Sequence, residues 1–323
     1  MILAGDIGGT KTLLALYEPG TKQLNEVVCK QYPSADYANF SDLLQTFLHA
    51  TNPRRLEAAA LGVAGPVIDQ HCVTTNLPWV ISTTELQQSL QIDKAYLLND
   101  LQATAYGMLH LPSNDFCCLN KGSKVSGNVA VIAAGTGLGE AILYHEGEDR
   151  WHPIATEGGH CEFGPQNALQ DRLLQWLRDR YPEHVSIERI LAGPGISNLY
   201  QFLLEEKRAT PGDDRPPLPD AKTINELAFK KDDPIALEAL ILFTEIYGAE
   251  AGNLALKSFS RGGVFIGGGI APKILPLLRD GHFMRGFSKK GRFSAVLQDM
   301  PVNLSLNELT GLLGAAWFAF NHR

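Results

Sequence analysis

Short apolar runs and helical patterns alternate along the first third of the chain. Two segments, 41–50 and 101–111, carry apolar residues at helical spacing, and Ser41 stands where it can cap the first of them. Around these segments lie apolar runs of the length of strands. The runs are 2–4, 13–17, 25–32, 57–65 and 94–100. Strands that alternate with helices predict an α/β layer with a mixed sheet.

The opening pattern returns in the second part of the chain. Residues 128–145 repeat an apolar run, a glycine-rich corner and a second apolar run. Mostly helical patterns follow, with a polar, Pro-rich surface loop at 208–220, and then a strand, a glycine corner and a helix over 262–278. The predicted helices are 169–181, 196–208, 234–259 and, near the C-terminus, 309–320.

Each of these two patterns is expected to open a lobe. We predict a small α/β lobe over residues 1–110 and a large α/β lobe over 111–304, with the C-terminal helix (305–323) returning to the small lobe. The run 234–259 is a candidate surface for an oligomer, but packing in the core is the preferred explanation of its apolar residues. Leu173, Leu174, Trp176 and Leu177 fit the core face of a helix.

The composition is that of a globular protein without an affinity for nucleic acid. The chain has 323 residues, 45% of them hydrophobic, and a net charge of −7. The densest basic segment, 288–292, fits a solvated loop. We find no apolar stretch near the roughly 20 residues that span a bilayer, and no secretory signal. Five scattered cysteines without a C-x-x-C pair favour the reducing cytoplasm.

The stretch GDIGGTKT (5–12) nearly matches the phosphate loop G-x-x-x-x-G-K-[ST], with Thr10 in place of the second glycine. That loop must open a helix, whereas LLALY and a Pro-Gly turn follow here, which is the pattern of a strand. The glycines are therefore expected at the bend of a β-hairpin. Glycine there permits a positive φ and lets the backbone approach an anion. A plain tight turn is the alternative.

Two further glycine corners support the interpretation that the first hairpin binds phosphate. AAGTGLG (133–139) forms a second predicted hairpin, with Thr136 in the place that Thr10 takes in the first. Two bare hairpins, one in each lobe, can grip a phosphate chain from both sides. The third corner, IGGGIAP (266–272), joins a strand to a helix and would let a flat nucleoside lie on its backbone.

Together the three corners resemble the phosphate and adenosine motifs of the actin-like ATPase superfamily, which includes sugar kinases, actin and heat-shock chaperones. The resemblance implies a two-lobe α/β fold of the ribonuclease H-like type with a cleft between the lobes, and ATP as co-substrate. It also implies that Asp6 faces Mg²⁺ through water, because Mg²⁺ keeps much of its hydration shell. The implied ATP-binding residues are Gly5, Asp6, Ile7, Gly8, Gly9, Thr10, Gly135, Thr136, Gly137, Gly267, Gly268 and Gly269.

Three further stretches narrow the resemblance. LLND ends with Asn99 and Asp100, TEGGHCEFGP carries Glu157 and His160, and HVSIERILAGPG carries Glu188. Together they resemble the bacterial glucokinase family, the hexokinase type without zinc, from the first residues to the last helix. Carboxylates and an amide suit the hydroxyl pairs of a hexose. The resemblance assigns hexose contacts to these five residues and makes Asp100 the base that accepts the proton of the attacking hydroxyl.

Three of these residues also have a purely structural explanation. Asp100 is equally suited to cap the helix 101–111, Glu188 to be a surface acid in a helix, and His160 to be a hydrogen-bonded core histidine. Zinc-containing relatives carry a cysteine cluster just after their histidine. Here Cys161 is followed by EFGPQNALQ without another cysteine, so we expect no zinc.

The resulting prediction is phosphorylation of glucose on its 6-hydroxyl by ATP, to give glucose 6-phosphate for glycolysis. The alternatives are a kinase for another hexose, such as mannose, fructose or an N-acetyl amino sugar, and a non-catalytic sugar-sensing regulator with the same fold. A regulator would not need the base at Asp100, and no DNA-binding helix pair precedes the motif that starts at residue 5. The sequence leaves the donor open among ATP, ADP and polyphosphate.

Overall fold

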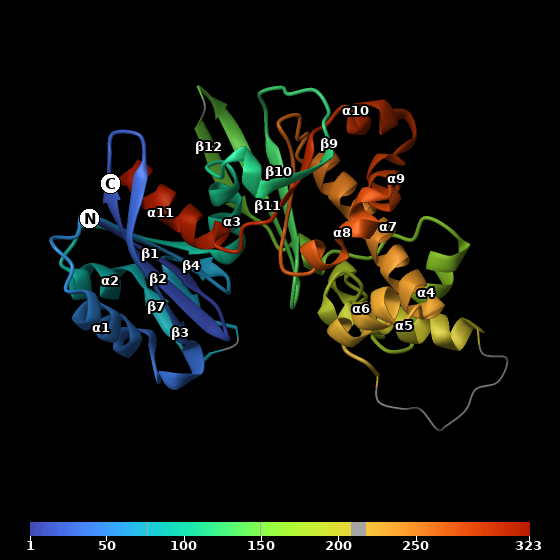
Figure 1. The fold of residues 1–323 in the computed structure, drawn as a ribbon, viewed down its shortest axis with the longest axis horizontal. Helices are drawn as coiled ribbons and strands as arrows, with labels where there is room; N and C mark the ends of the chain where they lie inside the picture. Colours follow the sequence, from blue (N-terminus) through green and yellow to red (C-terminus); the bar gives the residue numbers. More distant parts are fainter. Residues whose placement is uncertain (76, 149, 208–217) are drawn as a thin grey trace. The chain divides into compact units, whose positions relative to one another are not determined.

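The computed structural model describes residues 1–323 except 76, 149 and 208–217 (Figure 1). Most of the loop predicted at 208–220 therefore lies outside the described residues. The chain divides into two compact units. Unit 1 comprises Met1–Phe116, Glu146–Ala155 and Asn307–Arg323, and unit 2 comprises Cys117–His145 and Thr156–Leu306.

Unit 1 is built around a five-stranded sheet in the order β3-β2-β1-β4-β8. Strand β1 pairs antiparallel with β2 and parallel with β4, and β4 pairs parallel with β8. The mixed sheet predicted for this part of the chain is therefore confirmed. The strands are β1 (Ile2–Ile7), β2 (Lys11–Pro19), β3 (Leu24–Pro33), β4 (Ala58–Val63) and β8 (Lys94–Asn99).

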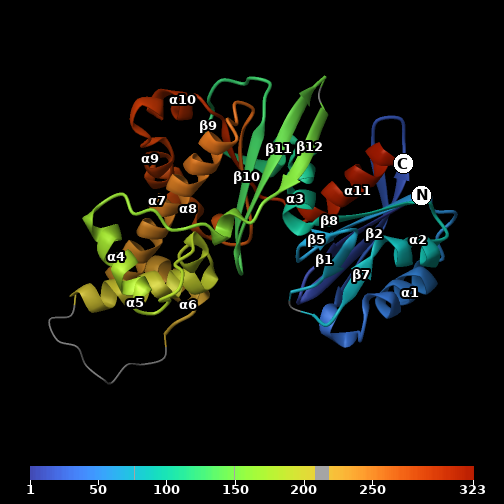
Figure 2. The same cartoon turned by 180° about the vertical axis from the view of Figure 1, so that it is seen from behind.

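Helices cover both faces of this sheet, because successive side chains of β1 point to opposite faces. Leu3 and Ile7 pack with α1 and α2, whereas Ile2 and Ala4 pack with α11. Both views show α11 along the face opposite α1 (Figures 1 and 2), and α11 also contacts α3. The helices of this unit are α1 (Phe40–Thr51), α2 (Thr83–Leu90), α3 (Asp100–Met108) and α11 (Thr310–His322).

A small antiparallel sheet follows β4 along the chain, in the order β5-β6-β7. Trp79 precedes its last strand and is fully buried, and its indole N–H donates to the Tyr37 carbonyl at 3.2 Å. This bond ties the small sheet to the segment before α1. The strands are β5 (Val67–Ile68), β6 (His71–Val73) and β7 (Val80–Ser82).

The second large sheet has six strands in the order β12-β11-β10-β13-β14-β9. Strand β10 pairs antiparallel with β11 and parallel with β13, so the arrangement of β1, β2 and β4 recurs here. The repeat that residues 128–145 predicted is confirmed. The strands are β9 (Phe116–Asn120), β10 (Val129–Ala134), β11 (Leu138–Gly147), β12 (Arg150–Ala155), β13 (Gly263–Gly267) and β14 (Val302–Ser305).

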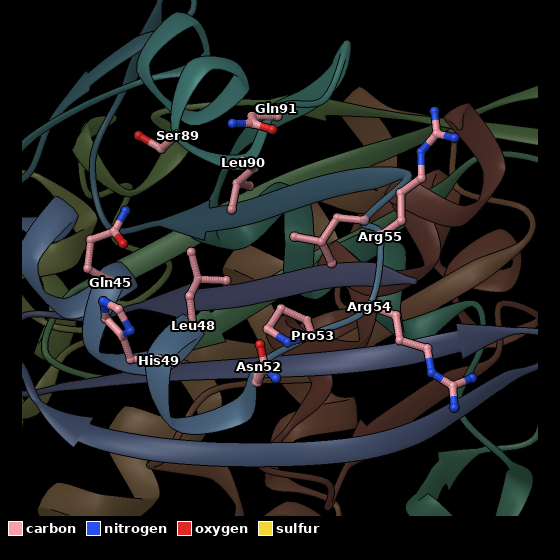
Figure 3. A pocket seen from close by; sticks show the side chains of 11 residues that line it. Gln45, Leu48, His49, Asn52, Pro53, Arg54, Arg55, Ser89, Leu90 and Gln91 are labelled. Carbon is pink, nitrogen blue, oxygen red and sulfur yellow. The ribbon is translucent and has the colours of Figure 1, made fainter.

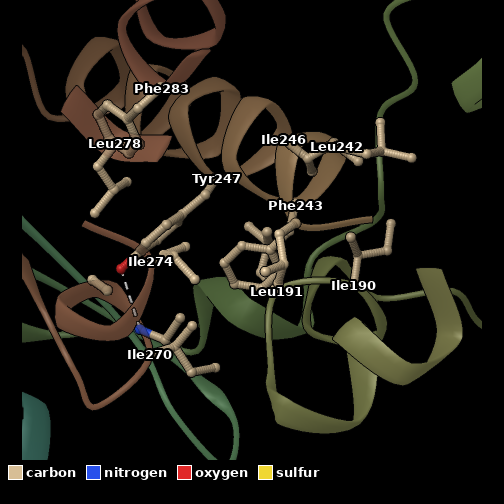
Figure 4. Packing of buried hydrophobic residues seen from close by; sticks show 14 of the residues in the cluster. Ile190, Leu191, Leu242, Phe243, Ile246, Tyr247, Ile270, Ile274, Leu278 and Phe283 are labelled. Carbon is tan, nitrogen blue, oxygen red and sulfur yellow. Dashed lines mark hydrogen bonds between the residues drawn. The ribbon is translucent and has the colours of Figure 1, made fainter. Parts of the chain in front are cut away.

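The helices of unit 2 pack around α7 (Pro234–Lys257). Its residues Phe243, Ile246 and Tyr247 are buried in one cluster with Ile270 and other apolar residues (Figure 4). Core packing, rather than a surface for a second copy, therefore explains the apolar residues of this helix. The other helices are α4 (Ala168–Arg178), α5 (Gly193–Lys207), α6 (Ala221–Lys230), α8 (Leu275–Arg279), α9 (His282–Ser288) and α10 (Ser294–Gln298).

Some elements were not indicated by the periodicity of the sequence. The short helices α2 and α6 are capped by Ser82 and Asp220, whose side chains accept hydrogen bonds from the amides of Glu85 and Thr223. The segment after the third glycine corner also differs from the prediction of one helix. It forms a 3₁₀ turn, η5 (Ala271–Ile274), followed by α8, and each of the two begins beside a proline.

Candidate active site

The first glycine corner is the bend of the β1–β2 hairpin and does not open a helix. The two strands pair up to Ile7 and Thr12, and the Gly8 amide donates to the Lys11 carbonyl at 3.0 Å. The Ser34 hydroxyl donates to the Gly8 carbonyl at 2.7 Å and so holds the bend from one side. The hairpin predicted for GDIGGTKT is therefore confirmed.

Three of the residues assigned to ATP lie in β1, namely Gly5, Asp6 and Ile7. The side chain of Ile7 is only 1% exposed, and Leu61 fills the space that a side chain on Gly5 would take. Gly5 and Ile7 can therefore contribute to binding only through their backbone. At the tip of the hairpin, Gly9 is partly exposed and Thr10 is exposed.

Asp6 lies near the end of β1, half-buried against the start of α11. Its Oδ2 is 3.5 Å from the position that a side chain on Gly311 would occupy. Burial raises the pKa of Asp6, and the Lys11 ammonium partly offsets this rise. A cation beside this carboxyl would favour its ionised form, so Asp6 suits a position that faces a metal ion.

The second glycine corner is the bend of the β10–β11 hairpin. The Gly135 amide donates to the Gly137 carbonyl at 2.8 Å, and the Gly193 amide at the start of α5 donates to the Gly135 carbonyl at 2.9 Å. Within the described residues, no neighbouring atom lies within 4 Å of the position of a side chain on Gly135. The packing of the protein therefore does not require glycine at Gly135, and its bare backbone leaves space for a ligand.

The third corner follows β13 and is fastened to the second. Gly268 has a φ of +83°, and a side chain there would stand 2.3 Å from the Ala134 carbonyl oxygen, so only glycine fits. The buried Tyr247 hydroxyl accepts a hydrogen bond from the Ala134 amide at 3.2 Å, which Figure 4 marks with a dashed line. The same hydroxyl lies 3.5 Å from the Gly267 carbonyl oxygen. Tyr247 therefore links the bases of two corners.

The glycines of the two hairpins do not use the positive φ that glycine permits. A positive φ occurs at Gly268 but not at Gly8, Gly135 or Gly137. At Gly137 a side chain would stand 2.4 Å from Oε2 of Glu188, so Glu188 would have to move to accommodate it. The hairpins therefore close through ordinary φ values.

Glu188 lies in the 3₁₀ turn η4 (Ile187–Arg189), partly buried against the second hairpin. Its Oε2 accepts a hydrogen bond from the Leu138 amide at 2.9 Å. The explanation of Glu188 as a surface acid in a helix does not account for this hydrogen bond. The Ile187 amide donates to the Cys161 carbonyl at 2.8 Å, which joins the turn of Glu188 to the segment that carries His160.

Glu157 and His160 lie at the 3₁₀ turn η3 (Gly158–His160). Their side chains are 69% and 62% exposed, and the His160 Nε2 is 3.9 Å from the Glu157 Oε2. The explanation of His160 as a core histidine is therefore wrong. Both side chains are accessible to a ligand of unit 2.

Asn99 and Asp100 lie where β8 meets α3. The cap of α3 is Asn99, whose Oδ1 accepts from the Leu101 amide at 2.9 Å in a capping box with Gln102. The alternative that made Asp100 the cap is therefore wrong, although its Oδ1 also accepts from the Leu101 amide at 2.9 Å. Asn99 is engaged through Nδ2 as well, which donates to the Gly65 carbonyl at 3.1 Å.

The predicted site residues are divided between the units. Unit 1 contains the first corner together with Asn99 and Asp100, and unit 2 contains the other two corners together with Glu157, His160 and Glu188. Within unit 2 the structure brings Glu188 against the second corner.

Sequence reasoning missed two buried residues beside these groups. They are Tyr247, described above, and Glu140, whose carboxyl group lies against Gly158. The only signal for Glu140 was its place inside the apolar run of β11.

Other features bear on the site less directly. In the described part of the chain, no group of three or more His, Cys, Asp or Glu side chains could hold a metal ion. None of the described helices is long and apolar enough to cross a membrane. All five cysteines are free thiols.

A cavity of about 540 Å³ at the ends of α1 and α2 is lined by side chains such as His49 and Arg55, and it contains none of the predicted site residues (Figure 3).

Comparison with known proteins identifies the family. The model of the family described as Glucokinase matches residues 3–322. The chain belongs to the glucokinase family. A curated glucokinase from Nostoc sp. is 39% identical over 335 residues, which cover 98% of each chain.

Solved structures share the fold of this chain. The crystal structure of a glucokinase from an Antarctic psychrotroph has a TM-score of 0.89 at 32% identity and covers 99% of this chain and 98% of that one. A ROK family glucokinase from Streptomyces griseus, solved with glucose and AMPPNP, has a TM-score of 0.64 at 21% identity, with 99% of each chain covered. The actin-like ATPase fold implied by the three glycine corners is therefore confirmed.

Proposed function

We propose that this member of the glucokinase family transfers the γ-phosphoryl group of ATP to the 6-hydroxyl of glucose. The observation that carries the proposal is the match to the family over residues 3–322, in a chain that retains the bare hairpins and the carboxylate of Asp100. The relative from Nostoc sp. is named glucokinase, in agreement with this proposal.

Asp100 is proposed as the general base. Asp100 stands at the first position of α3, while the Asn99 side chain caps the N-terminus of the helix. The positive end of the helix dipole favours the ionised form that a base requires. Asp100 would accept the proton of the 6-hydroxyl as this oxygen attacks the γ-phosphorus, and general base catalysis of this kind contributes about 10²–10⁴-fold.

Asn99, Glu157, His160 and Glu188 are proposed as the remaining contacts to glucose, together with Asp100. The exposed carboxylate of Glu157 and the imidazole of His160 can accept from or donate to sugar hydroxyls. Glu188 uses Oε2 for the Leu138 amide, so we assign its other oxygen, Oε1, to the sugar. The second amide hydrogen of Asn99 is assigned to the sugar in the same way.

ATP is proposed to bind along the three glycine corners. The open space at Gly135 and Gly269 supports this assignment, because the protein's own described atoms do not fill it. Asp6 would face Mg²⁺ through water, and Mg²⁺ would neutralise charge on the phosphates. We propose no role for zinc.

We also propose that the protein works in the cytoplasm as a homodimer, with no nucleic-acid or membrane partner. Five free thiols fit a reducing compartment. Sedimentation velocity tests the dimer, which a single species of the monomer mass of 35.3 kDa at assay concentrations would contradict.

A coupled assay of the purified protein tests the proposed function. The panel combines glucose, mannose, fructose and N-acetylglucosamine with ATP, ADP and polyphosphate. We expect the highest kcat/KM with glucose and ATP, loss of activity with EDTA, recovery with Mg²⁺, and no loss with a chelator selective for zinc. Preference for another sugar would favour the alternative hexose kinase, and absence of transfer to any sugar would favour a regulator.

A further inference from the structure

A buried carboxyl group lies against the segment that carries Glu157 and His160. Glu140, on β11, is only 2% exposed, and among the described residues its Oε1 has no hydrogen-bond partner. Its Oε2 stands 1.9 Å from the position that a side chain on Gly158 would occupy. The carboxyl group therefore fills the space beside Gly158, between the two predicted sugar ligands in the sequence.

The same strand holds this segment at neighbouring points. The Thr156 hydroxyl donates to the Glu140 carbonyl at 3.0 Å. The Gly158 amide in turn donates to the Thr156 hydroxyl oxygen at 3.3 Å. A side chain on Gly159 would stand 2.2 Å from the Leu138 carbonyl oxygen. The segment 156–160 therefore rests directly on the first residues of β11.

We propose that Glu140 is a positioning residue, which holds the segment 156–160 in its sugar-binding shape through the contact of its carboxyl group with Gly158. This inference rests on the proposed function, because that function assigns glucose contacts to Glu157 and His160. The neutral carboxyl can stay in this closed place. The ionised form requires water or a cation around it, and admitting either displaces the segment.

Burial, together with the surrounding charges, places the ionisation of Glu140 in the neutral range of pH. Burial and then the Glu250 carboxylate on α7 raise the pKa of Glu140 to about 7, while the Lys257 ammonium lowers it. Glucose binding should therefore weaken as the pH rises through this value. Other titratable groups on the surrounding elements include Tyr247 on α7, Lys290 after α9, Glu188 in η4, His145 and Glu146 on β11, and Glu157 and His160 on the segment itself.

The test compares the KM for glucose of the wild type and of Glu140→Gln from pH 6 to pH 8.5. The amide keeps the shape of the neutral carboxyl and cannot ionise. If only the neutral form binds, the competent fraction of the wild type falls from about 0.9 to about 0.1 between pH 6 and pH 8, so its KM should rise about tenfold relative to the variant. His160 is present in both proteins, so its own contribution cancels in this ratio.

Two controls separate positioning from general damage. Glu146→Gln, an exposed carboxylate on the same strand, should follow the wild-type profile. Glu250→Gln removes the like charge, so the midpoint of its pH profile should lie at lower pH than that of the wild type. The ratio of the KM for ATP of the wild type to that of Glu140→Gln should not change comparably with pH.

Calorimetric titration of the wild type with glucose alone gives a measurement that needs no variant. At pH 7.5, binding should take up protons, as shown by heats that change with the ionisation enthalpy of the buffer. A KM ratio that stays constant from pH 6 to pH 8, or binding without proton uptake, would overturn the role of Glu140. Failure to phosphorylate any sugar at any pH would instead overturn the proposed function.

Discussion

Replacing Glu140 by Gln should remove a pH-dependent loss of stability from the folded protein. Burial and Glu250 raise the pKa of Glu140 from 4.5 to about 7, so the folded state holds this proton more tightly than the unfolded chain does. Stability is therefore lost as the pH rises from the unfolded value to the folded one, and no further loss occurs above it. The whole shift corresponds to about 3 kcal/mol, of which about 2.5 kcal/mol falls between pH 5 and pH 8.

Denaturant unfolding at pH 5 and pH 8 measures this contribution. The free energy of unfolding of the wild type minus that of Glu140→Gln should be lower at pH 8 than at pH 5 by about 2.5 kcal/mol. Glu146→Gln is the matched control, because the pKa of that exposed carboxylate is lowered by His152 and Arg150 and gives no loss of this sign. The same difference at both pH values would refute the reasoning, since Glu140 would then ionise as easily in the folded state as in the unfolded chain.

Three further outcomes are expected. Glu157→Gln and Glu188→Gln should each weaken glucose binding by roughly 1.5–3 kcal/mol and leave ATP binding nearly unchanged, because each removes the charge from one hydrogen bond to the sugar; calorimetry showing equal losses for both ligands would point to a folding defect. Tyr247→Phe should raise the KM for ATP severalfold more than that for glucose, because the buried Ala134 amide loses its partner; equal changes would contradict its proposed link to the nucleotide corners. Saturating glucose should protect the amides of 98–100 and 156–160 from hydrogen exchange, and unchanged exchange there would count against the assigned ligands.

The features that could be predicted from the sequence are those that depend on local patterns. The hairpin after β1 followed from an apolar run and a Pro-Gly turn behind GDIGGTKT, and the antiparallel pairing of Asp6 with Leu13 confirms it. The second hairpin followed in the same way from residues 128–145. Both are closed by bonds between residues a few positions apart, so the information lies within one short window.

The features that were missed depend on contacts between distant parts of the chain. Glu188 bonds the Leu138 amide across a separation of 50 residues, and no periodicity encodes such a contact. Glu140 is buried because Gly158 packs on its carboxyl group, which is a tertiary contact. Local reasoning also offered Asp100 as the alternative cap of α3, whereas Asn99, one residue earlier, forms the capping box.

The most direct test of the account is the rate of glucose 6-phosphate formation by Asp100→Asn at saturating glucose, ATP and Mg²⁺. The account predicts turnover about 10²–10⁴-fold below that of the wild type, because the amide can hold the 6-hydroxyl but cannot accept its proton. Glucose binding should stay within a few-fold of the wild type, and Asp93→Asn, an exposed residue just before β8, should be fully active. Near-normal turnover by Asp100→Asn would contradict the proposed mechanism.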